Sequence, residues 1–130
     1  MNLIPDSFRD LLQTETQAFA VLLTQSDPQL LLMTMMWFSV DGEHILFNSV
    51  PTSHKHKNII ANPKLHFMIF NPVNMYRYLE ISGTVIEVTQ EGANDHNVYL
   101  AKEKYGWDDG TFGENRVMYR VRVDKVRAIE

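Results

Sequence analysis

Two lysines, Lys55 and Lys57, lie close together in a short polar segment that follows an apolar run. Ser53 is a residue type that favours the start of a helix, and Pro63 disfavours helical backbone in the residue before it, so the sequence predicts a helix over Ser53–Ala61. The first amides of a helix have no partner within it and carry partial positive charge. Together with the two lysines, these amides form a candidate site for a phosphate group.

The same two lysines could instead belong to a solvated, basic first turn, as on many surface helices. Their charge is unfavourable beside the helix dipole, so a purely structural role explains them less well than usual, and the residues alone leave both interpretations open. Two histidines of this segment, His54 and His56, point roughly 200° apart on a helix and cannot hold one metal ion. The sequence therefore predicts no metal site, and no order of serine, histidine and aspartate indicates a hydrolase.

Two aromatic segments are further candidates. Residues 34–38, Thr-Met-Met-Trp-Phe, could form a flat apolar platform for a ring or could be core and dimer contact, and core is the simpler interpretation. Residues 76–78, Tyr-Arg-Tyr, could contact a ligand or pack across the edge of a sheet. Neither segment decides between these roles by itself.

These candidates lie among segments with the patterns of strands and short helices. Residues 117–124 alternate apolar and polar side chains, which is typical of a strand with one solvated face. Asp41-Gly42 favours a tight hairpin turn, and Gly83 lies where a long strand needs a bulge or bend. The sequence predicts helices at about residues 5–12, 53–61 and 91–105, and strands at about residues 16–25, 30–39, 44–49, 65–70, 76–88 and 117–124.

Six strands joined mostly by tight turns predict an antiparallel, mainly β fold, a small β-barrel with short helices that plug or flank its ends. In the third helix, Val98, Ala101 and Tyr105 form an approximate apolar stripe, and residues 106–115, with three glycines, are expected to be a loop. No linker or repeat divides the chain, so we interpret residues 1–130 as a single domain.

Composition limits the classes of partner. The formal net charge of −4 argues against a nucleic-acid partner, and the absence of cysteine excludes a disulfide framework, a thiol nucleophile and a zinc–thiolate site. No apolar run is long enough to cross a bilayer as a helix, and the first residues lack the features of a signal peptide. We therefore expect a cytoplasmic protein with no membrane partner.

Four motifs occur in order along the chain. They are Trp37-Phe38 before Asp41-Gly42, the run Ile45 to Ser49, Ser53-x-Lys55-x-x-Asn58 before Asn62-Pro63, and Tyr76 to Gly83. This ordered set, over nearly the whole chain, resembles the pyridoxamine 5'-phosphate oxidase-like superfamily of FMN-binding split barrels. Within that superfamily, the chain looks most like the PPOX-class proteins that depend on FMN or coenzyme F-420.

The resemblance implies a homodimer with two cofactor sites at the subunit interface. It places the phosphate of FMN, or alternatively of F-420, at the start of the second helix, and the ring along the second and third strands. The partner chain would contribute from the long strand, near Tyr78. The implied cofactor-binding residues are Met35, Met36, Asn48, Ser49, Ser53, His54, Lys55, Lys57, Asn58 and Tyr78.

If such a cofactor binds, its ring performs the redox chemistry and the protein supplies position and electrostatics. We therefore expect an oxidoreductase that passes hydride to or from a small conjugated substrate and needs no catalytic residue of its own. The alternatives are a non-catalytic FMN-binding or carrier protein of the same fold, and a plain dimerisation module. Redox cycling of the bound ring by a substrate would distinguish the enzyme from the carrier.

Overall fold

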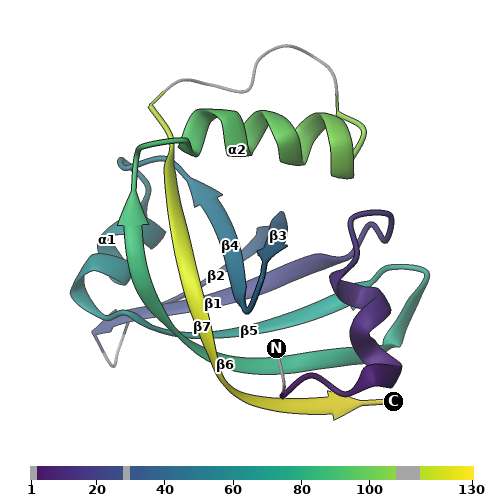
Figure 1. Cartoon of the computed structure of the whole chain (residues 1–130). Coiled ribbons are helices and arrows are strands. Elements are labelled where there is room, and N and C mark those ends of the chain that lie inside the picture. Colours follow the sequence, from purple (N-terminus) through teal and green to yellow (C-terminus); the bar gives the residue numbers. More distant parts are fainter. Residues whose placement is uncertain (1–2, 28–29, 108–114) are drawn as a thin grey trace.

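The computed structural model describes residues 3–27, 30–107 and 115–130, and it is mainly β (Figure 1). The predicted helices and strands all occur, with ends that shift by a few residues. Residues 28–29 of the expected turn and residues 108–114 of the expected loop lie outside the described residues. In chain order, the elements are the 3₁₀ helix η1 (Asp6–Leu12), β1 (Phe19–Asp27), β2 (Leu30–Met36), β3 (Phe38–Asp41), β4 (His44–Ser49), α1 (His54–Ala61), β5 (Lys64–Asn71), β6 (Asn74–Thr89), α2 (Ala93–Tyr99), the π-helical turn η2 (Leu100–Lys104) and β7 (Val117–Ile129).

All neighbouring strands pair antiparallel in one sheet, in the order β2-β1-β5-β6-β7-β4-β3. The edge strands β2 and β3 are separated in the chain only by Trp37, so the two edges of the sheet must approach each other there. The sheet therefore curls into a half-barrel, which confirms the expected antiparallel barrel with short helices. It has seven strands rather than six because the strand predicted over residues 30–39 is broken at Trp37.

Two glycines make the tight parts of this sheet possible. Gly42 connects β3 to β4 with a φ of 60°, which a residue without a Cβ adopts freely, and the expected hairpin is confirmed. At Gly83 the register between β6 and β7 shifts, which confirms the expected bulge. A Cβ at Gly83 would lie 2.7 Å from a methyl group of Val121 and 2.8 Å from the carbonyl oxygen of Arg122. The close approach of β7 therefore requires glycine here.

The core lies on the concave side of the half-barrel. Alternation in β7 buries Val117, Tyr119 and Val121, as the period of two predicts. Phe47 of β4 packs edge to face against Phe67 of β5, with ring centroids 5.1 Å apart, so the two arms of the curled sheet meet across the core. Helix η1 adds its own apolar face to this cluster.

Helix α2 and η2 run across one end of the half-barrel (Figure 1). Of the apolar stripe expected in this helix, Val98, Ala101 and Tyr105, only Ala101 is fully buried, while Val98 is exposed and Tyr105 is half-buried, so the stripe is only partly right. The buried face includes two polar side chains, so the spacing of apolar residues in the sequence does not reveal it. Its members are Ala93, Asn97, Leu100, Ala101 and Lys104.

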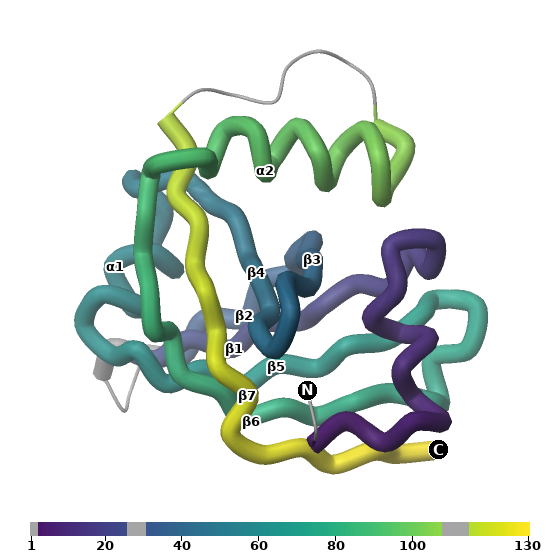
Figure 2. The backbone as a smooth tube through the Cα atoms, in the orientation of Figure 1, coloured from purple at the N-terminus to yellow at the C-terminus, as the bar shows by residue number. Residues whose placement is uncertain are grey.

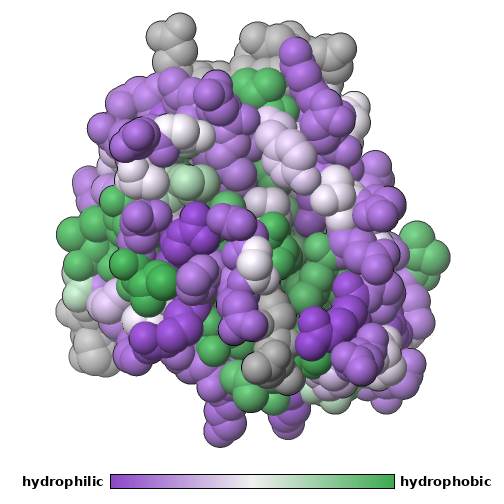
Figure 3. Space-filling model, viewed as in Figure 1, coloured by the Kyte–Doolittle hydropathy of each residue, from purple (hydrophilic) through white to green (hydrophobic). Residues whose placement is uncertain are grey.

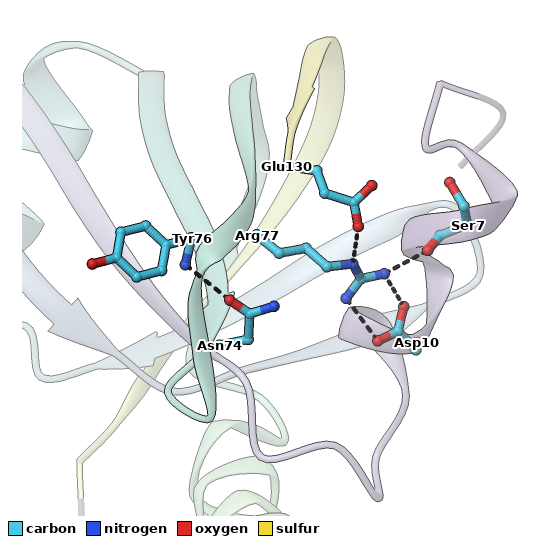
Figure 4. Close-up of polar contacts among 6 residues, drawn as sticks. All are labelled: Ser7, Asp10, Asn74, Tyr76, Arg77 and Glu130. Carbon is cyan, nitrogen blue, oxygen red and sulfur yellow. Dashed lines mark hydrogen bonds and ion pairs between the residues drawn. The ribbon is translucent and has the colours of Figure 1, made fainter.

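Near the C-terminal end of β7, Arg77 of β6 fastens η1 to the sheet (Figure 4). Its guanidinium donates to both carboxylate oxygens of Asp10 and to the carbonyl oxygen of Ser7, and it lies 3.6 Å from a carboxylate oxygen of Glu130. The guanidinium also lies over the ring of Phe8, 4.6 Å from its centroid. Figure 2 shows the result, with the opening segment beside the C-terminal end of β7 and the β5–β6 connection.

The face of the molecule in Figure 3 is largely hydrophilic, with hydrophobic side chains in separate groups. Among the described residues, we find no helix with the length and apolar character needed to cross a membrane.

Candidate functional site

A cleft of about 300 Å³ lies where the ends of β2 and β4 meet the start of α1 and the inner face of α2. Trp37, at the break between β2 and β3, is one of its lining residues. One end of the cleft is polar and cationic, and the other is apolar. The lining residues are Met35, Met36, Trp37, Asn48, Ser49, Val50, Ser53, Lys55, Asn97, Leu100 and Arg116.

The cationic end is formed by Lys55 of α1 and Arg116, the residue before β7. Neither side chain pairs with a carboxylate of the described residues. Lys55 donates there to the hydroxyl of Ser49, and Arg116 donates to the amide oxygen of Asn48. Burial lowers the pKa of Lys55, and the positive charge of Arg116 lowers it further. The two cations thus repel each other across the cleft, which a bound anion would relieve.

Hydroxyl groups connect Lys55 to the start of α1. The ammonium of Lys55 donates to the Oγ of Ser49, at 3.3 Å, and Ser49 Oγ lies 3.1 Å from Ser53 Oγ. Ser53 Oγ in turn donates to the carbonyl oxygen of Val50 and accepts from the backbone N–H of His56. Ser53 is therefore the N-cap of α1, as its residue type predicted.

The apolar end of the cleft is formed by Met35, Met36, Trp37 and Leu100. Trp37 stacks on Tyr105, with centroids 4.9 Å apart and planes 13° apart, so its indole is held in one orientation. The hydroxyl of Tyr105 lies 2.5 Å from the carbonyl oxygen of Ala18 and fixes that ring in turn. A rigid aromatic and thioether surface of this kind suits a flat ring.

Six of the ten implied cofactor-binding residues come together in this cleft. They are Met35, Met36, Asn48, Ser49, Ser53 and Lys55. The segment at residues 34–38 thus contributes to the cleft as well as to the core, where Phe38 is buried.

The other four lie outside the cleft lining. His54 and Lys57 are exposed on α1, and the side chain of Asn58 donates to the hydroxyl of Thr24 on β1. Tyr78 lines a separate groove on the outer face of the sheet. His56 faces the barrel and contacts the hydroxyl of Tyr119, while His54 does not share that side, in agreement with the helical geometry. The described residues contain no group of three or more side chains that could hold a metal ion.

Sequence reasoning missed Arg116, Asn97 and Leu100. Arg116 follows a segment expected to be a loop and stands alone, without a neighbouring basic residue, so no spacing marks it. Only the pairing of β7 with β4, in which Asn48 lies opposite Met118, brings this arginine to the cleft. Asn97 and Leu100 belong to the helix face that the apolar pattern misplaced.

Comparison with known proteins identifies the family and the fold. The sequence model of the pyridoxamine 5'-phosphate oxidase family matches residues 4–130. The chain belongs to this family. No protein with a curated description matches the chain.

Solved structures with the same fold cover nearly the whole chain. An F420 reductase shares 27% identity with a TM-score of 0.82, over 95% of this chain and 98% of that protein. A putative pyridoxamine 5'-phosphate oxidase from Listeria innocua shares 17% identity with a TM-score of 0.69, over 95% of each chain. An FAD-binding protein from Mesorhizobium loti shares 14% identity with a TM-score of 0.68, over 95% of this chain and 92% of that one. The last two show the split-barrel fold alone.

Proposed function

We propose that this protein is an oxidoreductase that binds a phosphate-bearing flavin or deazaflavin in the cleft and transfers hydride to or from a small conjugated substrate. The observation that carries the proposal is the pair of cations, Lys55 and Arg116, which face one cleft without a carboxylate partner among the described residues. A phosphate would neutralise them and could accept from the hydroxyl of Ser49. The apolar end of the cleft then suits the ring.

When bound, the ring supplies the hydride chemistry. The residues of the chain hold the cofactor in place: the cationic end binds its tail, and Met35, Met36 and Trp37 limit where the ring can lie. Among the described residues, the cleft lining contains no carboxylate, imidazole or thiol. This composition suits a reaction in which the protein orients the cofactor and excludes water and in which no side chain acts as a nucleophile.

Coenzyme F420 is our first choice of cofactor and FMN the second. The reason for F420 is that the structure at 27% identity is that of an F420 reductase, while the Listeria innocua and Mesorhizobium loti proteins share only 17% and 14%. The reason for FMN is electrostatic, because two cations at one end of the cleft suit the dianion of a phosphomonoester.

The experiment compares each cofactor with its phosphate-free counterpart: F420 with its deazariboflavin core, and FMN with riboflavin. Absorbance or fluorescence titration of the wild type should show preference for the phosphate-bearing member of at least one pair. Lys55→Met and Arg116→Met should each weaken that binding about tenfold or more, about 1.4 kcal/mol, and leave the phosphate-free member nearly unchanged. Lys102→Met, which removes an exposed lysine from η2, is the control.

The sequence also assigned Lys57 to the phosphate site, although Lys57 is exposed outside the cleft. Lys57→Met tests that assignment, because it should weaken phosphate-dependent binding only if Lys57 contacts the phosphate. A wild type that binds neither pair, or that binds both members of each pair equally, would refute the phosphate site. Reduction of the bound ring, followed by its reoxidation with a conjugated acceptor, distinguishes the enzyme from a non-catalytic carrier.

We also propose that the protein functions as a homodimer through the outer face of β2 and β1. Met33 on the edge strand β2 is 72% exposed, and it lies beside Leu23 of β1 in the sheet. Together with Met68 and Tyr78 they line an open groove of about 590 Å³. The rest of the groove includes polar and charged side chains, so the apolar part is the side formed by β2 and β1. Exposed apolar side chains that lie next to one another mark an interaction site, and a second copy of the chain is the partner we propose.

The dimer face adjoins the candidate site, since exposed Met35 of β2 also lines the cleft. A partner chain here would lie next to the cofactor, as the family resemblance implies. We expect sedimentation or light scattering to show a dimer that Met33→Lys dissociates. Met75→Lys, at an exposed methionine at the start of β6, should leave the dimer intact. A monomeric wild type would contradict this part of the proposal.

A further inference from the structure

A chain of buried polar side chains lies directly behind Arg116 and joins β3, β4, α2 and the start of β7. Asn48 of β4 is at its centre, buried, with hydrogen bonds to three groups, two on α2 and one just before β7. Its Nδ2 lies 2.8 Å from the carbonyl oxygen of Ala93 and 3.1 Å from Nδ1 of His96. Its Oδ1 lies 2.8 Å from Nε of Arg116.

The chemistry of the partners fixes the orientation of this amide. Arg116 can only donate, so the atom facing its Nε must be the amide oxygen, and the carbonyl of Ala93 can only accept, so the atom facing it must be the amide nitrogen. The nitrogen has a second hydrogen, and it is directed to Nδ1 of His96, which must therefore be unprotonated.

The other ring nitrogen of His96 then carries the proton. Nε2 donates to the Oγ of Ser39 on β3, at 2.8 Å. Ser39 receives this hydrogen bond and is not activated as a nucleophile, which argues against a hydrolytic role for the constellation. Burial lowers the pKa of His96 to about 4, so the imidazole is neutral at neutral pH, as the arrangement requires.

We infer that His96 is a positioning residue for the anion-binding end of the cleft. Its neutral Nδ1 accepts the second amide hydrogen of Asn48 and, together with the carbonyl oxygen of Ala93, keeps the amide in the orientation that presents Oδ1 to Arg116. The guanidinium uses its Nε–H in this bond, and its two terminal amino groups make no hydrogen bond to the described residues. They remain available for a phosphate, at a fixed position beside Lys55.

Without an acceptor at the position of Nδ1, one amide hydrogen of Asn48 loses its partner inside the protein. The amide keeps its bonds to the carbonyl oxygen of Ala93 and to Arg116, but it is held less firmly, and any rotation would present its NH₂ group to Arg116, which also only donates. Arg116 would then be held less firmly too, while the apolar end of the cleft would be unchanged. The inference rests on the proposed function, because it concerns how the same site binds a phosphate.

The test compares His96→Leu with His96→Asn, in which the side-chain oxygen can replace Nδ1 as acceptor. The probes are F420 with its deazariboflavin core and FMN with riboflavin, measured by titration. We expect His96→Leu to weaken binding of the phosphate-bearing member about tenfold, and the phosphate-free member less than twofold. His96→Asn should restore most of the loss.

A double-mutant cycle adds a readout that a merely structural role would not change. In an Arg116→Met background, His96→Leu should have little further effect on phosphate-dependent binding, because the arginine through which His96 acts is already absent. In ¹⁵N spectra of the unliganded protein, the Arg116 Nε–H signal should exchange faster with water in His96→Leu than in the wild type.

Two outcomes would overturn the inference. Equal weakening of both members of a pair would show that His96 only supports the fold, and an unchanged preference for the phosphate-bearing member would show that Arg116 does not depend on it. A wild type that shows no phosphate preference is a separate failure, that of the proposed function. In that case, the ¹⁵N experiment still tests whether His96 holds Arg116, and unchanged exchange would refute the positioning role.

Discussion

Lys104 is a buried lysine without a carboxylate partner among the described residues, and replacing it should stabilise the protein. Its side chain is 3% exposed, at the inner end of η2. The ammonium donates to the carbonyl oxygen of Phe38, at 2.7 Å, and lies 3.6 Å from the centroid of the Phe38 ring. These contacts do not replace the lost hydration, and burial lowers the pKa of Lys104 to about 8.

The size of the effect follows from this pKa. A fall from the ordinary 10.5 to about 8 corresponds to about 3 kcal/mol, since one pKa unit is about 1.4 kcal/mol. Lys104→Met keeps most of the apolar stem and removes the charge, and it also removes the hydrogen bond to Phe38, which contributes about 1–2 kcal/mol. The net gain at pH 7 should therefore be about 1–2 kcal/mol, or about 5 °C in the midpoint of thermal unfolding.

The pH dependence gives a sharper test. Below pH 8 both the folded and the unfolded state hold the proton, so the full cost of burying the charge applies. Between pH 8 and 10.5 the unfolded state binds more protons than the folded state, and the wild type gains stability as the pH rises. The advantage of Lys104→Met should therefore shrink over this range.

Urea unfolding at pH 7, 9 and 10 measures this difference, because the other titrating groups are common to both proteins. Lys102→Met is the matched control, since Lys102 is an exposed lysine in the same turn and its replacement should change the free energy of unfolding by less than about 0.5 kcal/mol at each pH. If Lys104→Met is destabilised by 1 kcal/mol or more at pH 7, or if its difference from the wild type does not change with pH, the reasoning is refuted.

Two further changes test the fold. Gly83→Ala would place a Cβ against Val121 and a backbone carbonyl, so we expect the free energy of unfolding to fall by about 3 kcal/mol in urea titrations, and a loss below 1 kcal/mol would mean that β7 can move aside. Arg77→Met removes the partner that lowers the pKa of Asp10, so hydrogen exchange in η1 should become faster and the protein should lose about 1–2 kcal/mol. Arg9→Met, on the exposed side of the same helix, is the control, and equal effects of the two changes would contradict the role given to Arg77.

Local sequence was sufficient for most of the elements. Period-two alternation located β7, glycine after aspartate located the β3–β4 hairpin, and Ser53 located the start of α1, because each of these signals acts within a few residues. The break at Trp37 carried no such signal. At the break, Trp37 stacks on Tyr105, which is distant in the sequence.

The candidate site divides in the same way. Six of the implied residues come from the end of β2, the end of β4 and the start of α1. These three elements follow one another closely in the sequence, with only β3 between β2 and β4, which favours their meeting in one place. Arg116 reaches the same cleft only through the pairing of β7 with β4, and a sequence pattern does not specify which strands pair.

The sequence by itself determined a mainly β chain with a basic helix start and an expected phosphate site there. Only the tertiary structure decided that the second cation is Arg116, that His96 and Asn48 stand behind it, and that Lys104 is buried. The physical reason is that these features consist of contacts between elements distant in the sequence. The free energy of such contacts comes from packing and desolvation, which depend on all the elements that surround a residue in the folded protein.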